Sequence, residues 1–166
     1  MIKYLVIDVD GTLTDGKIYM GPGGEVMKAF NIKDGCGIHD ILLPNHIVPV
    51  ILTGRTSDIV LSRCQELGIA EIRQGVKDKA AELRTIASDF SSVAYIGDDI
   101  NDLLTMKVVK DSGGLIGAPQ DAVKEVLEIA DFVSSYKGGD GAVREFIEWV
   151  VKQNQAVSSG MENSRS

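Results

Sequence analysis

Short apolar runs alternate with helical patterns along most of this chain. Six runs have the length and composition of buried strands, at residues 4–7, 48–52, 69–72, 93–96, 114–116 and 132–133. Between and after them, apolar side chains recur with helical spacing at residues 37–43, 57–67, 78–88, 100–109, 120–129 and 141–153. Strands that alternate with helices in this way are typical of a parallel sheet covered on both faces. The pattern therefore predicts an α/β fold with a doubly wound parallel sheet.

The segment 17–31 interrupts this alternation. Two short runs with strand character, 18–20 and 25–30, flank the sequence Gly-Pro-Gly-Gly at 21–24. This pattern predicts a β-hairpin that projects from the end of the first strand. Because a two-stranded hairpin is marginally stable alone in water, we expect it to pack against another subunit. The alternative is a mobile flap beside a site, since loops near sites often move.

Length and composition indicate one domain and exclude several functional classes. The strand and helix pattern covers residues 1–153 of 166, and the small polar residues 154–166 are expected to be a disordered tail. A net charge of −7 without any basic run argues against nucleic-acid binding. No apolar run reaches the roughly 18 residues of a membrane span, and Asp8 comes too early for a signal peptide. Two cysteines make no disulfide framework, so we expect a cytoplasmic protein.

Two carboxylates end the first predicted strand. Asp8 and Asp10 follow Tyr4–Ile7 and precede Gly11. Because strand side chains alternate, the two carboxylates point the same way. Like charges this close repel unless a cation lies between them or they share a proton. Both solutions are typical of catalytic sites.

Further polar residues stand where other predicted strands end. Thr53 and Gly54 follow the second strand, and a hydroxyl beside a glycine offers an O–H and an open backbone N–H to a phosphate. Lys79 opens a predicted helix, where a cation opposes the helix dipole unless an anion compensates. Thr-Gly turns are common, and such a lysine is often merely solvated, so each signal is weak alone.

An acidic cluster follows the strand 93–96. Asp98, Asp99 and Asp102 lie within five residues, and their oxygen ligands suit Mg²⁺. Acids in the first turn of a helix also serve as caps, which accounts for Asp99 or Asp102 without a metal. Capping does not account for the two acids on another strand.

The order of these motifs resembles the haloacid dehalogenase (HAD) superfamily of phosphotransferases, which have a Rossmann-like sheet. The matching features are Asp-x-Asp-Gly-Thr at 8–12, Thr53, Lys79 and Gly-Asp-Asp-x-x-Asp at 97–102, which together span most of the chain. The resemblance implies that Asp8 is the nucleophile and Asp10 the general acid and base. It also implies that Thr53, Lys79 and the backbone N–H of Gly11 bind the phosphoryl group.

The same resemblance implies a Mg²⁺ site. Asp8 and Asp98 would supply carboxylates and Asp10 its backbone carbonyl. Asp99 and Asp102 would act in the outer shell, where they orient metal-bound water and Lys79.

Three stretches narrow the resemblance to a capless subfamily in which a hairpin replaces the cap domain. Residues 14–21, 28–35 and 138–145 are similar to the 3-deoxy-D-manno-octulosonate 8-phosphate (KDO 8-phosphate) phosphatase family. Members of that family and their sialic-acid 9-phosphate relatives are tetramers whose hairpins form a central barrel. The resemblance thus implies a homotetramer built through the hairpin, with each site closed by a neighbour. The loop 138–141 is expected to be a lid that reaches across the interface, or else a plain turn before a helix.

The implied activity is Mg²⁺-dependent hydrolysis of a phosphorylated ulosonic acid, KDO 8-phosphate, through an aspartyl-phosphate. The expected substrate contacts, beyond Asp10, Thr53 and Lys79, are Asn31, Lys33, Asp34, Gly35, Gly54, Arg55 and Arg63. Arginine suits a sugar-acid carboxylate because its guanidinium pairs bidentately. Arg63 could equally lie on a solvated helix face. Lys33 and His39 stand where the family has arginine, which weakens the assignment of one sugar.

Three alternatives remain at this point. A sialic-acid-type 9-phosphate would suit the same small, open site. A phospho-accepting receiver is also doubly wound, but it carries its aspartate after the third strand, where this chain has Gly75. A non-catalytic oligomeric module of a sugar-nucleotide pathway would be expected to lose Asp8, Asp10 or Lys79, and all three are present.

Overall fold

The computed structural model describes residues 1–163, except for the side chains of 161–163, and its centre is a parallel sheet of six strands. The sheet order is β5-β4-β1-β6-β7-β8, and every neighbouring pair is parallel. The strands are β1 (Tyr4–Ile7), β4 (Val48–Leu52), β5 (Glu71–Arg73), β6 (Val93–Ile96), β7 (Leu115–Ala118) and β8 (Phe132–Val133). Because β1 lies in the middle of the sheet, residues that follow it sit between the ends of β4 and β6.

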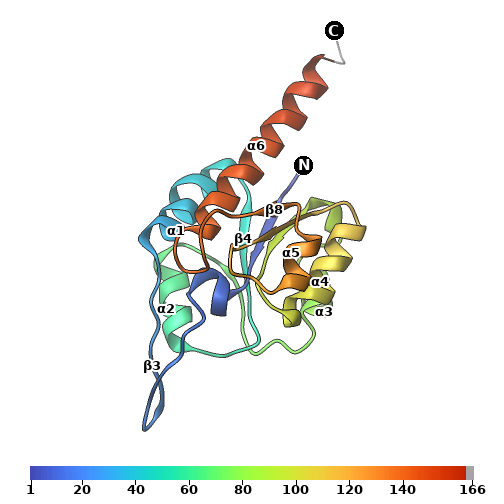
Figure 1. Cartoon of the computed structure of the whole chain (residues 1–166). Helices are drawn as coiled ribbons and strands as arrows, with labels where there is room; N and C mark the ends of the chain where they lie inside the picture. The colour runs from blue at the N-terminus through green and yellow to red at the C-terminus, as the bar shows by residue number, and fades with distance from the viewer. Residues whose placement is uncertain (164–166) are drawn as a thin grey trace.

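Helices cover both faces of this sheet (Figure 1). They are α1 (Ile32–Cys36), α2 (Asp58–Glu66), α3 (Lys79–Arg84), α4 (Ile100–Asp111), α5 (Lys124–Ile129) and α6 (Ala142–Asn163). Leu5 and Ile7 belong to a buried cluster with side chains of α2 and α6, whereas Val6 belongs to a second cluster with side chains of α3, α4 and α5. Successive strand side chains point to opposite faces, so one strand serves both cores. The predicted doubly wound α/β fold is confirmed.

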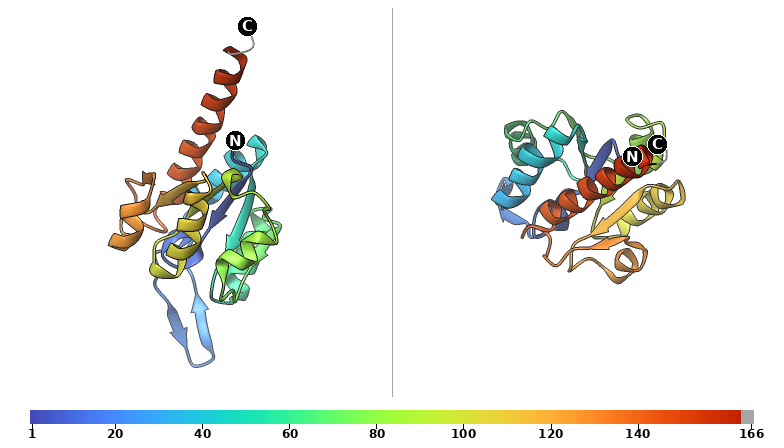
Figure 2. Two further views of the ribbon diagram at one scale, coloured as in Figure 1. Left: turned by 90° about the vertical axis from the view of Figure 1, so that its right-hand side faces the viewer. Right: turned by 90° about the horizontal axis from the view of Figure 1, so that it is seen from above.

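The predicted hairpin is present and extends away from the sheet (Figures 1 and 2). It consists of β2 (Tyr19–Gly21) and β3 (Gly24–Met27), which pair antiparallel. Its apolar side chains are largely exposed, at Ile18, Met20, Val26 and Met27. In the described chain, no helix is both long and apolar enough to cross a membrane.

The C-terminal segment differs from the expectation of a disordered tail after residue 153. Helix α6 continues through Asn163, and residues 164–166 of the expected tail lie outside the described residues. Asn154 anchors the extension, because its side chain accepts a hydrogen bond from the Ile2 N–H and donates one to the Ile2 carbonyl, each 2.8 Å long. A second difference is that helix begins at Ile32 rather than 37, because the Asn31 side chain caps it by accepting from the Lys33 N–H.

Candidate active site

The chain turns sharply where β1 ends, and this turn carries the first site residues. The Asp8 N–H still donates to the Ile96 carbonyl of β6, after which Val9–Leu13 forms an irregular helical turn. Gly11 within it has φ +96°, which favours glycine, and a Cβ atom there would overlap the Asp98 carboxylate. Gly11 therefore lets the two strand-end loops approach each other closely.

Three carboxylates from two of these loops form a compact cluster. Each of Asp8, Asp98 and Asp102 offers an oxygen, and these oxygens lie within 4.8 Å of one another. Burial, followed by the charge of Asp102, raises the pKa of Asp8 from 3.8 to about 8 and the pKa of Asp98 to about 7. Such oxygen donors suit a hard cation such as Mg²⁺, which would relieve their mutual repulsion. The arrangement thus fits the implied metal.

Lys79 holds two of these carboxylates from the start of α3. Its Nζ donates to Asp8 Oδ1 at 2.7 Å and to Asp102 Oδ1 at 2.6 Å, and only 3% of its side chain is exposed. Burial lowers the pKa of Lys79, but the two carboxylates outweigh this effect and leave the pKa above its usual value. Asp102 Oδ1 also accepts from the Tyr95 hydroxyl at 2.7 Å. Asp102 therefore positions Lys79 against Asp8, and Tyr95, which the sequence did not single out, supports this contact.

Thr53 and Arg55 reach the same edge of the sheet from the end of β4. Thr53 is buried, its N–H donates to the Arg73 carbonyl, and its Oγ1 accepts from the Arg55 N–H at 3.4 Å. The Arg55 side chain is 45% exposed, and its Nε lies 3.8 Å from Asp10 Oδ2. The predicted strand-end residues are thus brought together around β1.

Asp10 contacts the residue that follows the hairpin strand β3 and is not one of the three clustered carboxylates. Its Oδ1 accepts a hydrogen bond from Lys28 Nζ, and Lys28 also pairs with Glu25 Oε1 at 2.7 Å. Sequence reasoning missed Lys28 and Glu25, because charged side chains on a hairpin are normally solvated and nothing in the local spacing marks these two.

Other expected substrate residues do not line this cluster. Asp34 is fully buried and accepts from the Arg144 N–H at 2.9 Å, so it holds the start of α6. Arg63 pairs with Glu66 at 2.8 Å, and a Cβ atom on Gly35 would meet its guanidinium at 2.5 Å. Asn31 caps α1. Their roles in substrate binding stay predictions.

The remaining predicted residues also lie apart. Lys33 borders a separate pocket of about 410 Å³ beside α6. The exposed His39 pairs with Asp40 at 2.6 Å. Asp99 is exposed and caps α4, where it accepts from the Ile100 N–H at 2.7 Å. The capping alternative thus accounts for Asp99 but not for buried Asp102.

The loop 138–141 packs on the turn Val9–Leu13 of its own chain. The Gly139 N–H donates to the Thr12 carbonyl at 3.0 Å, and a Cβ atom on Gly138 would overlap the Gly11 carbonyl oxygen. Within one chain, the two glycines allow the loop to support Gly11 and Thr12. The expected lid that reaches a neighbour's site stays a prediction.

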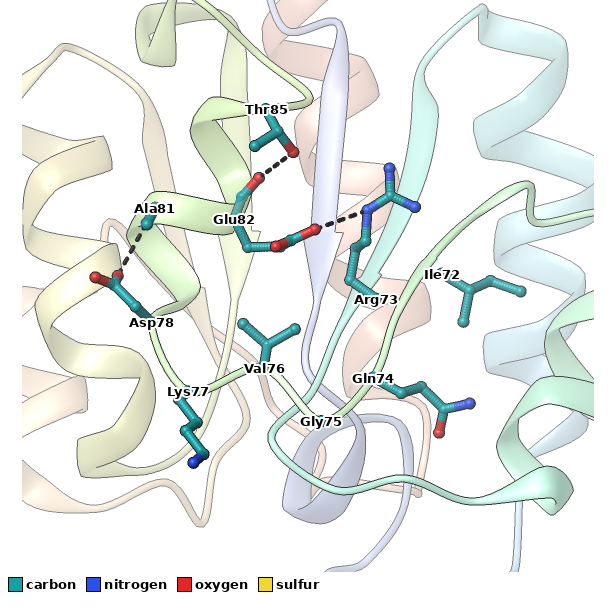
Figure 3. Close-up of a pocket in the computed structure, with 10 residues that line it drawn as sticks. All are labelled: Ile72, Arg73, Gln74, Gly75, Val76, Lys77, Asp78, Ala81, Glu82 and Thr85. Atoms are coloured by element: carbon teal, nitrogen blue, oxygen red, sulfur yellow. Dashed lines mark hydrogen bonds and ion pairs between the residues drawn. The ribbon is translucent and has the colours of Figure 1, made fainter.

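A pocket of about 560 Å³ lies beside β5 and the start of α3 (Figure 3). Arg73 and Glu82 form an ion pair of 3.0 Å at its wall, and the Asp78 side chain accepts from the Ala81 N–H. Its lining residues, 72–78, 81, 82 and 85, include none of the clustered carboxylates. The cluster of Asp8, Asp98 and Asp102 therefore lies outside this pocket.

Comparisons with known proteins agree with this geometry. No protein-family model matches the chain. The 3-deoxy-D-manno-octulosonate 8-phosphate phosphatase of Salmonella typhi is 44% identical over 148 residues, which are 87% of this chain and 76% of the relative. The crystal structure of the Moraxella catarrhalis phosphatase of that name, in complex with magnesium, phosphate and KDO, has a TM-score of 0.85 at 34% identity and covers 98% of this chain and 92% of its own.

A second solved structure relates the chain to the wider HAD superfamily. A protein from Legionella pneumophila, described as a HAD superfamily (subfamily III A) hydrolase, has a TM-score of 0.82 at 34% identity over 99% of this chain and 91% of its own. These three relatives are 34–44% identical to this chain over at least 76% of their own lengths, which is more sequence similarity than a shared fold alone requires. The chain therefore belongs to the 3-deoxy-D-manno-octulosonate 8-phosphate phosphatase family, within the HAD superfamily.

Proposed function

We propose that this protein is a Mg²⁺-dependent phosphatase that hydrolyses KDO 8-phosphate to KDO and phosphate. The observation that carries the proposal is the buried contact of Lys79 with Asp8, inside a cluster of carboxylates that needs a cation. The sequence relatives and the Moraxella complex with magnesium, phosphate and KDO support the substrate and the metal.

Asp8 and Asp98 would hold Mg²⁺ together with the backbone carbonyl of Asp10. Mg²⁺ held there would supply positive charge that offsets the repulsion between the Asp8 carboxylate and the phosphate dianion. Lys79, Thr53 and the Gly11 N–H then bind the equatorial phosphoryl oxygens, whose charge they offset in the transition state.

The reaction uses two carboxylates in succession. An Asp8 oxygen bonds to phosphorus as the bond from phosphorus to the sugar oxygen breaks, and Asp10 gives that oxygen a proton. Asp10 then takes a proton from water, whose oxygen bonds to phosphorus as the Asp8–phosphorus bond breaks. Asp10 Oδ2 is available for both transfers, because Lys28 engages only Oδ1 and Arg55 Nε lies 3.8 Å from Oδ2.

We assign recognition of the sugar acid to the solvent-exposed part of the site around Arg55. Arg55 is half exposed and only loosely paired with Asp10, so its guanidinium is available to a carboxylate. We assign further sugar contacts to Asn31, Lys33 and Arg63, completed by a neighbouring subunit.

We also propose a homotetramer assembled through the hairpin. Three exposed apolar side chains, Met20, Val26 and Met27, lie on a two-stranded sheet that has unpaired edges, and exposed Ile18 directly precedes it. Burying these side chains and pairing these edges between copies would stabilise the hairpin. Gel filtration at the size of a monomer would contradict this assembly.

Phosphate release from KDO 8-phosphate tests the function directly. The protein with Mg²⁺ should hydrolyse it, and EDTA should stop the reaction. A panel that also contains sialic-acid-type 9-phosphates identifies the sugar. Equal activity in EDTA would refute the mechanism, and preference for a nine-carbon sugar would refute the substrate.

A further inference from the structure

Lys28 is a buried cation in an otherwise exposed part of the molecule. It directly follows β3, and the residue is 8% exposed, whereas its neighbours Val26 and Met27 are 62% and 52% exposed. A lysine ammonium is rarely buried without ionic partners, because leaving water costs free energy that only opposite charges offset. The burial of Lys28 therefore depends on the carboxylates that it meets.

Those carboxylates are Asp10 of the turn Val9–Leu13 and Glu25 of the hairpin. Lys28 Nζ donates to Asp10 Oδ1 and lies 2.7 Å from Glu25 Oε1. Arg55 approaches the same pair at longer range, 3.8 Å from Asp10 Oδ2 and 4.0 Å from Glu25 Oε1. The two cations, Lys28 and Arg55, thus each lie between the two anions, Asp10 and Glu25. Lys28 makes the short, shielded contacts, and Arg55 makes the long, exposed ones.

As a result, the two oxygens of Asp10 have different surroundings. Lys28 engages Oδ1, while Oδ2 has only the distant Arg55 beside it. Among the described residues, the carboxylates gathered within 4.8 Å are those of Asp8, Asp98 and Asp102. Lys28 therefore holds the Asp10 carboxylate outside that cluster, with one oxygen fixed and the other left for proton transfer.

We infer that Lys28 is a positioning residue for proton transfer, which orients Asp10 so that Oδ2 faces the leaving oxygen of the ester. The inference rests on the proposed phosphatase activity and names the part of the hairpin that serves it. The proton passes from Asp10 Oδ2 to the ester oxygen as the bond between that oxygen and phosphorus breaks. Lys28 keeps its own protons throughout. The hairpin is thus a component of the catalytic machinery as well as an assembly element.

Two simple esters isolate this role. Ethyl phosphate and p-nitrophenyl phosphate carry the same phosphoryl group, but the ethyl alkoxide must be protonated as it leaves and nitrophenolate need not be. In Lys28→Met, kcat/KM should fall about 100-fold for ethyl phosphate and by less than about 5-fold for p-nitrophenyl phosphate. Lys28→Arg should restore most of the loss, because a guanidinium also donates to Asp10.

Lys17→Met is the matched control. Lys17 lies at the other end of the hairpin, and its side chain is 72% exposed, so this variant should change either kcat/KM by less than about 2-fold. Thermal unfolding without metal and gel filtration check that Lys28→Met folds and assembles. Should it not, Lys28→Gln, which keeps a polar side chain, undergoes the same comparison.

Losses of equal size on both esters, in whichever variant folds, would overturn the inference. The proposed function fails separately. If the wild-type protein hydrolyses both simple esters but not KDO 8-phosphate, the substrate assignment is wrong, and the ratio between the two esters still decides the role of Lys28.

Discussion

The stability of the metal-free protein should fall as the pH rises from 5 to 8. Burial and the neighbouring Asp102 raise the pKa of Asp8 from 3.8 to about 8 and that of Asp98 to about 7. Both values lie above those of the unfolded chain, so the folded protein binds more protons in this range. The stabilisation is complete below the unfolded pKa and is lost as the pH rises through the folded pKa values.

The size of this effect follows from the two pKa increases. The increases are not additive, because Asp8 and Asp98 interact and Lys79 is close to both. Between pH 5 and 8, Asp8 with a folded pKa of about 8 would by itself lose nearly three units of linkage, or about 3–4 kcal/mol of stability at about 1.36 kcal/mol per unit. For a protein of this length, such a loss lowers Tm by about 6–15 °C. Mg²⁺ favours the charged carboxylates, so it should stabilise the protein much more at pH 8 than at pH 5.

Thermal unfolding followed by circular dichroism measures how Tm changes with pH, once without Mg²⁺ and once with it. Asp98→Asn removes one carboxylate of the cluster and should flatten the fall of Tm with pH. Asp111→Asn is the matched control, because Asp111 is exposed at the far end of α4 and lies outside the cluster, and it should leave the slope unchanged. A metal-free Tm that is level or rises between pH 5 and 8 would refute the reasoning, as would Mg²⁺ stabilisation of equal size at both pH values.

Three substitutions test other parts of the site. Asp8→Asn should reduce kcat about 10⁴-fold or more while the protein stays folded, as measured by phosphate release and circular dichroism; residual activity near the wild-type level would exclude Asp8 as the nucleophile. Tyr95→Phe removes a 2.7 Å hydrogen bond to a buried carboxylate and should cost about 1.5–3 kcal/mol in urea unfolding, and an unchanged midpoint would contradict that role. Gly138→Ala pushes against the Gly11 carbonyl and should lower kcat at least about 10-fold, whereas Gly23→Ala has open space and should not; equal kcat values would show that the loop does not support the turn.

The sheet and the centre of the site could be predicted because the end of a buried strand is recognisable in the sequence as an apolar run followed by polar residues. Asp8, Thr53 and Asp98 each follow a buried apolar run, and parallel strands bring their carboxyl ends to one edge. The spacing of apolar residues likewise predicted a helix that begins near Lys79. No knowledge of distant contacts was needed for these residues.

Residues whose role depends on a distant partner were missed or misplaced. Lys28 is buried only because the hairpin folds back on Asp10, 18 positions earlier. Asp34 caps a helix that begins more than a hundred residues later, which no local pattern indicates. The polar segment after residue 153 has weak helix signals of its own, and its anchor, Asn154, pairs with Ile2 at the opposite end of the chain.

The hairpin and the last turns of α6 point in opposite directions from the sheet (Figures 1 and 2). The turn Val9–Leu13 lies toward the hairpin end, and the N-terminal residues lie toward the α6 end. A surface to which the protein is attached through α6 would thus face away from the hairpin. Immobilisation through that helix should leave the catalytic end open to dissolved substrate, which makes α6 the suitable handle for solid-phase assays.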